Sequence, residues 1–136
     1  MSTRLIIRDD GDVIVIDAYG KLATGQERNS LHAQLRRLAE GGRCRVLLNL
    51  SAVSSMDSAD VGELMAGHAV ITMAGGEMKL LSPLGQVADL LQTTRIGELM
   101  GAYATEASAL RSFTGPQRPR HRMAAKNEPR SEWYYG

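Results

Sequence analysis

The sequence predicts an α/β protein in which helices pack on one mixed sheet. Two β-rich runs, 5–7 and 13–16, flank an Asp-Gly turn, which is typical of an antiparallel hairpin. Residues 46–50 form a nearly unbroken apolar run, as expected of a strand that is buried on both faces. Strand-like and helical segments alternate after the hairpin, and this order indicates a layered α/β fold.

The first helix is predicted by apolar residues that repeat with helical spacing. The glycine pair 41–42 ends it, as a left-handed cap would. Four residues are expected on its buried face: Leu31, Leu35, Leu38 and Ala39.

A second helix is expected after a loop at 54–58 that is rich in capping residues. The glycine pair 75–76 ends this helix. One stripe is expected to face the core, formed by Val61, Leu64, Met65, His68 and Thr72.

The remaining elements are expected to complete the domain without internal repeats. In chain order they are a strand at 78–81, a helix that begins at Ser82-Pro83 and runs through Val87, Leu90 and Leu91, a short strand near 99–103 and a last helix at 105–113.

Charge is distributed unevenly along the 136 residues, although the whole chain carries a net charge of only +1. Residues 1–114 carry a net charge of −2, whereas 115–136 carry +3 and three of the four prolines. We therefore expect a folded domain at 1–114 and a flexible basic tail at 115–136. The tail contains Trp133-Tyr134-Tyr135, which is either a docking motif or an incidental feature of an unstructured terminus.

Several classes of function find little support. The near-neutral charge argues against direct binding of nucleic acid, and no apolar run approaches the roughly 20 residues that span a membrane. The first four residues lead into a strand-like segment and do not resemble a signal peptide. The single cysteine, Cys44, excludes an internal disulfide and fits a reducing, cytoplasmic compartment.

Signatures of catalysis and of metal binding are also weak. The three histidines lack metal-ligand spacing, and the glycine pairs follow helices and so do not form phosphate cradles. We expect Cys44 to be a small buried hydrophobe and His68 to be a core histidine with a satisfied ring. No enzyme activity, metal or cofactor is expected.

The segment 56–60 has more chemical interest. It lies between the buried strand and the second helix, at the end of the sheet where α/β folds place their sites. Asp57 can accept hydrogen bonds from backbone N–H groups, and the helix dipole favours Asp60 in the first turn. Local chemistry alone therefore favours a role in helix capping.

From about Leu5 to Phe113, the chain resembles a STAS domain, the fold of bacterial anti-sigma-factor antagonists. Five loose motifs in the expected order carry this resemblance. They are a G-x-L turn at Tyr19-Gly20-Lys21-Leu22, the strand 46–50 followed by Val53, the segment Met56-Asp57-Ser58-Ala59, the run 75–80, and the helix end at 90–96.

The resemblance implies that Ser58, directly after the motif aspartate, is a phosphorylation site. It implies a partner switch that regulates transcription: the unmodified antagonist binds a serine-kinase anti-sigma factor and frees the sigma factor. The kinase then uses ATP to phosphorylate the serine and end the interaction, and a phosphatase resets the switch. The expected partner-binding residues are Leu22, Ala23, Asp57, Ser58, Ala59, Asp60 and Gly62.

Two residues depart from the family pattern. Asp60 stands where the motif usually has glycine, and Ala23 stands where the family often has aspartate. Asp60 either partly imitates the phosphorylated state beside Ser58, or selects an unusual partner, or is simply a favourable first-turn residue. Loss of the aspartate at position 23 is expected to weaken recognition by the kinase.

A second function of another class stays open at this point. The chain would then be a STAS subunit of a larger assembly, either a stressosome-like scaffold or the small partner of a lipid-transport ABC complex. No membrane insertion is expected in either case, and the sequence leaves homodimer formation open.

Overall fold

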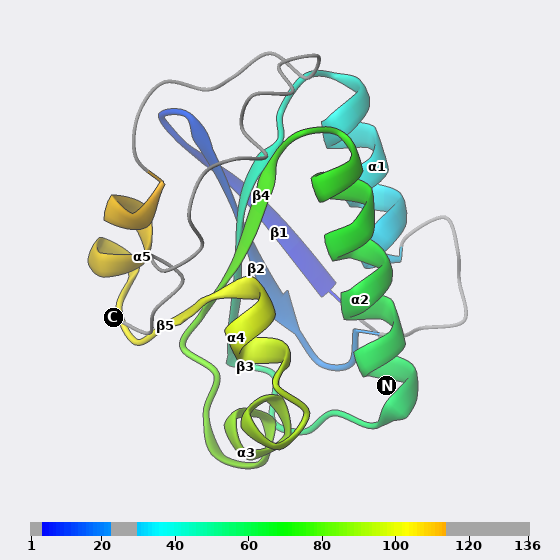
Figure 1. The fold of residues 1–136 in the computed structure, drawn as a ribbon, viewed down its shortest axis with the longest axis vertical. Helices are drawn as coiled ribbons and strands as arrows, with labels where there is room; N and C mark the ends of the chain where they lie inside the picture. The colour runs from blue at the N-terminus through cyan, green and yellow to red at the C-terminus, as the bar shows by residue number, and fades with distance from the viewer. Residues whose placement is uncertain (1–3, 23–29, 114–136) are drawn as a thin grey trace.

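The computed structural model describes residues 4–22 and 30–113, which form one mixed five-stranded sheet with helices packed on it (Figure 1). This architecture confirms the predicted fold class. The strands lie in the order β1-β2-β3-β4-β5, so each pairs with its neighbour in the chain. The elements are β1 (Arg4–Asp10), β2 (Val13–Tyr19), α1 (Leu31–Glu40), β3 (Arg45–Ala52), α2 (Ser58–Met73), β4 (Glu77–Leu81), α3 (Gly85–Thr93), α4 (Ile96–Met100), β5 (Ala102–Tyr103) and α5 (Glu106–Ser112).

β1 and β2 form the predicted antiparallel hairpin. Asp10 pairs with Val13 across a two-residue turn, and Gly11 has a φ of 64°, a backbone conformation that glycine adopts readily. The other neighbouring strands are parallel. Parallel strands need crossovers, and the helices between them supply these. The parallel strands therefore end at a common edge of the sheet.

Alternating side chains of the central strands divide the core into two layers. Ile16 of β2 and Leu48 of β3 belong to the larger layer, which is covered by α1 to α4. Val15 and Leu47 belong to the smaller layer beneath α5. Figure 1 shows α1 and α2 on one side of the sheet and α5 on the other. β3 is thus buried on both faces, as its apolar run predicts.

The glycine pairs end α1 and α2 as predicted. In α1 the left-handed residue is Gly42, with a φ of 84°. The N–H groups of Gly42 and Arg43 donate to the carbonyls of Ala39 and Leu38, which gives a Schellman motif. Gly75 has the same role after α2, with a φ of 86°. Each helix thus ends a few residues before the next strand begins.

The buried face of α2 differs from the predicted stripe. Leu64 and His68 are buried as expected, but Met65 and Thr72 are exposed and Val61 is half-buried. Because α2 is apolar on almost every side, its periodicity did not fix its orientation. The residues that α2 buries are Asp60, Leu64, Gly67, His68 and Ile71.

The third helix begins later than predicted. Ser82 has a φ of 54°, and Leu84 adopts an extended conformation as the N-cap, so α3 begins at Gly85. Ser82 precedes Pro83, and a residue before proline is disfavoured in the helical region. The dipeptide Ser82-Pro83 therefore forms a connection between β4 and α3.

The short strand expected near 99–103 is confined to Ala102–Tyr103, because residues 96–100 form α4. Arg95 separates α3 from α4 by adopting a left-handed conformation with a φ of 63°. A break at arginine leaves no glycine signal in the sequence, and for this reason α4 was not predicted. The last helix is confirmed as α5.

Two further expectations fall on residues outside the described ranges. The basic tail at 115–136, with Trp133-Tyr134-Tyr135, lies there, and so does Ala23. Within 4–22 and 30–113, no helix is long and apolar enough to cross a membrane.

Candidate functional site

The start of α2 is held in place by its loop and by α3. Val53 and Met56, in the loop after β3, are buried at 1% and 5% exposure. The Met56 N–H donates to Gln86 Oε1 at 2.9 Å, and Gln86 Nε2 donates to the Met56 carbonyl at 3.2 Å. The side-chain amide of α3 thus satisfies both backbone groups of the residue before the helix cap.

Asp57 and Asp60 form a reciprocal capping box at the N-terminus of α2. Asp57, in an extended conformation, accepts a hydrogen bond from the Asp60 N–H at 3.0 Å through Oδ1. Asp60 Oδ2 accepts from the Asp57 N–H at 2.9 Å. The predicted capping role is confirmed, and aspartate here replaces the glutamate or glutamine that closes most such boxes.

Lys21 joins this box from the segment after β2. Its ammonium donates to Asp57 Oδ2 at 3.0 Å and to Asp60 Oδ2 at 2.9 Å. The Asp60 side chain has no exposed surface, whereas 59% of the Asp57 side chain is exposed. One cation therefore joins a buried and an exposed carboxylate.

These contacts shift the pKa values of Asp57 and Lys21. The hydrogen bond from Lys21, followed by that from the Asp60 N–H, lowers the pKa of Asp57 to about 2. The hydrogen bonds to Asp60 and then to Asp57 raise the pKa of Lys21 above its usual range. Asp57 and Lys21 therefore remain charged throughout the physiological pH range.

Ser58 is the first residue of α2, and its side chain is exposed. Its backbone lies between the cap residue Asp57 and the first helical turn. The N–H groups and the dipole of a helix N-terminus favour a negative charge there. A phosphate attached to this hydroxyl would therefore lie where the helix N-terminus tolerates its charge and where a partner can reach it.

The expected partner-binding residues divide into two groups. Asp57, Ser58, Ala59 and Gly62 are exposed around the first turn of α2. Asp60 and Leu22 are fully buried at 0% exposure, so they support this surface from below. Ala23 belongs to the part of the chain that the structure does not describe.

The burial of Asp60 argues against its role as an imitation of phosphoserine. A residue that imitates phosphoserine presents its charge to the partner, but the Asp60 carboxylate lies inside the protein and contacts Lys21 and the Asp57 N–H. Its position agrees with the role of a favourable residue in the first turn of the helix.

Sequence reasoning missed the contributions of Lys21 and Gln86. The motifs place Lys21 only in the G-x-L turn, whereas its ammonium contacts residues 36 and 39 positions away. The available signal was a positive residue in one STAS-like motif together with an extra negative residue, Asp60, in another. Gln86 lies 30 residues from Met56 and has no local signal.

A strip of small and apolar side chains continues from Ser58 along the exposed side of α2. Met65 is 37% exposed and Met73 is 87% exposed. Exposed apolar surface of this kind often marks a protein contact. With helical spacing, the strip comprises Gly62, Met65, Ala66, Ala69 and Met73.

A second polar group joins α1 to α2. His32 Nδ1 lies 2.7 Å from Glu63 Oε2 and 3.2 Å from Ser30 Oγ. The same ring nitrogen faces both partners, so the ring does not connect an acid to a hydroxyl as a catalytic triad does. Ser30 is the N-cap of α1 and accepts a hydrogen bond from the Ala33 N–H.

Cys44 and His68 are both buried. Cys44 is 5% exposed, as expected for a small buried hydrophobe. Burial lowers the pKa of His68, and its Nε2 has no hydrogen-bond partner among the described residues, so the expected satisfied ring is not found there. Within these same ranges, no cluster of three or more His, Cys, Asp or Glu side chains could hold a metal.

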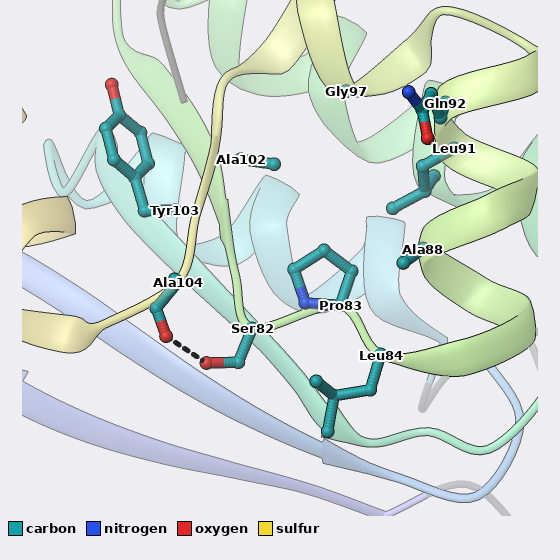
Figure 2. Close-up of a pocket in the computed structure, with 10 residues that line it drawn as sticks. All are labelled: Ser82, Pro83, Leu84, Ala88, Leu91, Gln92, Gly97, Ala102, Tyr103 and Ala104. Atoms are coloured by element: carbon teal, nitrogen blue, oxygen red, sulfur yellow. Dashed lines mark hydrogen bonds between the residues drawn. The ribbon is translucent and has the colours of Figure 1, made fainter. Parts of the chain in front are cut away.

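A pocket of about 350 Å³ lies apart from this site, between the ends of β4 and β5 and the helices α3 and α4 (Figure 2). Its lining is mostly apolar and includes Leu84, Ala88 and Leu91. The Ser82 hydroxyl at its edge already donates to the Ala104 carbonyl at 2.8 Å. Among the described residues that line the pocket, none carries a charge that would orient a polar ligand.

Comparison with known proteins agrees with this geometry. The family model for the STAS domain matches residues 4–109. No curated protein matches the chain.

Solved structures share the fold at low sequence identity. A provisionally assigned anti-sigma factor antagonist from Thermotoga maritima is 24% identical, with 78% of this chain and 91% of that chain covered and a TM-score of 0.66. An anti-sigma factor antagonist from Mycobacterium paratuberculosis is 17% identical, with 80% and 92% covered and a TM-score of 0.67. The phosphorylated form of the Bacillus cell fate determinant SpoIIAA is 22% identical, with 79% and 96% covered and a TM-score of 0.61.

Proposed function

The chain belongs to the STAS domain family, and we propose that it is an anti-sigma-factor antagonist whose partner-binding surface is the N-terminus of α2. The observation that carries this proposal is the exposed Ser58 at the start of a firmly capped helix. The apolar strip along α2 extends this surface and provides area for a protein partner. The structural neighbours that are named as anti-sigma factor antagonists support the same role.

We propose that phosphorylation of Ser58 switches this interaction. The partner is a serine-kinase anti-sigma factor, which binds the unmodified chain and transfers the γ-phosphate of ATP to the Ser58 hydroxyl. The chain itself supplies the acceptor and no catalysis. A phosphatase that hydrolyses the phosphoserine restores the binding form.

The switch acts through charge, with little effect on the fold. A phosphate adds about −1.5 to −2 charge at pH 7. The carboxylates of the capping box keep their contacts with the backbone and with Lys21, and we therefore expect α2 to stay folded after phosphorylation. Rebinding would require this new charge to lose its water, and a penalty of ~3 kcal/mol weakens binding more than 100-fold.

The test is incubation of the chain with ATP and each purified serine-kinase anti-sigma factor of the same cell. Mass spectrometry is expected to find one phosphate on Ser58, and none on Ser58→Ala. Ser55→Ala is the matched control, because Ser55 is an exposed serine of the same loop and its loss should leave phosphorylation intact.

The proposal fails if no kinase modifies Ser58, or if Ser55→Ala removes the phosphate as completely as Ser58→Ala does. Co-purification of an unmodified chain with a transport ATPase would instead favour a subunit of a larger assembly.

A further inference from the structure

Asp60 places a carboxylate where the resembled motif usually has glycine, and this carboxylate is completely buried. A buried charge is costly unless it is paired and hydrogen-bonded. The Asp57 N–H and the Lys21 ammonium both donate to Asp60 Oδ2, each at 2.9 Å. The Lys21 ammonium therefore places a positive charge directly beside this buried carboxylate.

Lys21 is itself held at both ends. Gly20 has a φ of 83°, so the chain turns immediately before Lys21. Leu22, immediately after it, is fully buried and anchors the backbone. The ammonium end contacts Asp57 and Asp60. Lys21 thus forms a short tether between the end of β2 and the first turn of α2.

The orientation of Ser58 depends on Lys21 because Asp60 carries a buried charge that the ammonium contacts. Asp57 precedes Ser58 directly, and its side chain has to accept from the Asp60 N–H with one oxygen while the other accepts from Lys21. Without the lysine, the buried Asp60 carboxylate would lose an ammonium donor that lies 2.9 Å from its Oδ2. The first turn would then relax until water or another donor reached that carboxylate.

We propose that Lys21 is a positioning residue for the Ser58 surface: through Asp57 and Asp60 it fixes the first turn of α2 in the orientation that partner and kinase recognise. This inference rests on the proposed function of Ser58. It adds to that function the ion pair of Lys21 with the buried Asp60 carboxylate, on which the Ser58 surface of this chain would depend.

Four variants test the inference: Lys21→Met, Lys21→Arg, Asp60→Asn and the double variant Lys21→Met/Asp60→Asn. Asparagine keeps an oxygen that can accept from the Asp57 N–H but carries no charge. Arg36→Met is the control for the loss of a positive charge, because Arg36 is an exposed residue of α1. Urea unfolding verifies that each variant is folded under the conditions of the assay.

The first measurement needs no partner. NMR titration of the Asp57 carboxyl and amide hydrogen exchange at Asp57 and Asp60 report the tether directly. In Lys21→Met we expect the pKa of Asp57 to rise from about 2 towards 3.8 and both amides to exchange at least tenfold faster. Lys21→Arg and Arg36→Met should retain the wild-type titration and protection.

The second measurement is kcat/KM for phosphorylation of Ser58 by the serine-kinase anti-sigma factor that modifies the wild-type chain. Lys21→Met is expected to lose at least tenfold. Lys21→Arg and the double variant should remain within threefold of wild type, because the first keeps a cation beside Asp60 and the second removes the charge at position 60. A simple contact between Lys21 and the partner would not be rescued by Asp60→Asn.

The two proposals can fail separately. If the wild-type chain is not phosphorylated, the proposed function is wrong, whereas the NMR measurement still decides whether the tether exists. If the wild-type chain is phosphorylated and Lys21→Met matches it in kcat/KM, the positioning role is wrong. The role is also wrong if the double variant is as poor a substrate as Lys21→Met.

Discussion

Asp57 and Asp60 have two roles: they cap the N-terminus of α2, and they fix the backbone around Ser58. Each carboxylate accepts from the backbone of the other residue, and the same two side chains hold Lys21. Because the box satisfies two N–H groups that a helix end leaves unpaired, the backbone on both sides of Ser58 is fixed. At the residue scale, the site is a rigid first turn that presents an exposed hydroxyl.

The sequence predicts the local part of this arrangement and misses the long-range part. An aspartate followed three residues later by a second aspartate indicates a cap, since both act within one turn. The contact of Lys21 with the box spans 36 residues, and no local pattern encodes it. The burial of Asp60 depends on that contact, so its role could not be settled from the motif alone.

His68 gives a prediction for the dependence of stability on pH. Burial lowers its pKa below the usual 6.5, so the unfolded chain binds more protons than the folded chain as the pH falls through that value. The free energy of unfolding should therefore decrease from pH 7.5 to pH 5.5. Urea unfolding of wild type and His68→Gln at the two pH values should show a smaller decrease in the variant. An equal decrease in both would contradict this account of His68.

At the scale of elements, α2 shows where periodicity carries little information. Its two ends were predicted, because Asp57 caps it and Gly75 stops it, and both signals are local. Its orientation was not, because exposed residues such as Met65 and Met73 are as apolar as those in the core. The same exposed side carries the apolar strip that we assign to partner binding. The apolar character of this side therefore explains both the incorrectly predicted buried face and the proposed binding surface.

Replacement by alanine of each of three glycines in or next to α2 should change the free energy of unfolding to a different extent. A Cβ at Gly62 would meet nothing within 4 Å, one at Gly67 would press on the end of the Leu35 side chain, and one at Gly76 would clash with the Cys44 backbone. Gly62→Ala should raise the free energy of unfolding by about 0.5–1 kcal/mol, through better helix propensity. Gly76→Ala should lower it by about 3 kcal/mol, with Gly67→Ala in between. Urea unfolding measures all three, and Gly76→Ala as stable as wild type would refute the close packing at that position.

At the scale of the whole molecule, polar contacts join segments that are distant in the chain. Arg8 of β1 donates to Asp17 of β2 at 2.7 and 3.0 Å and also reaches Glu106 of α5. Asn49 of β3 donates to Asp17 as well, and the hydrogen bond from Arg8 is the main reason why the pKa of Asp17 is lowered. The hairpin and the alternation of helices and strands followed from the sequence, but these cross-links did not, since each joins residues in different elements.

The uneven charge of the chain predicts the effect of removing 115–136, a segment with a net charge of +3. If 1–114 is the folding unit, the truncated chain should keep its free energy of unfolding within about 0.5 kcal/mol. Binding to an acidic partner should weaken at low salt and become equal to that of the full chain at high salt, because salt screens exposed charges. Urea unfolding and titration calorimetry at two salt concentrations measure these effects. A truncated chain that cannot fold would show that the domain boundary is wrong.

In the proposed switch, charge at Ser58 ends partner binding while the fold stays intact. Its most direct test compares the dissociation constants of unmodified and fully Ser58-phosphorylated chain for the same anti-sigma factor, together with amide NMR spectra of both forms. We predict binding at least 100-fold weaker after phosphorylation, with spectral changes confined to the start of α2 and to Lys21. Equal dissociation constants, or a phosphorylated chain whose spectrum has lost the dispersion of a folded domain, would contradict the account.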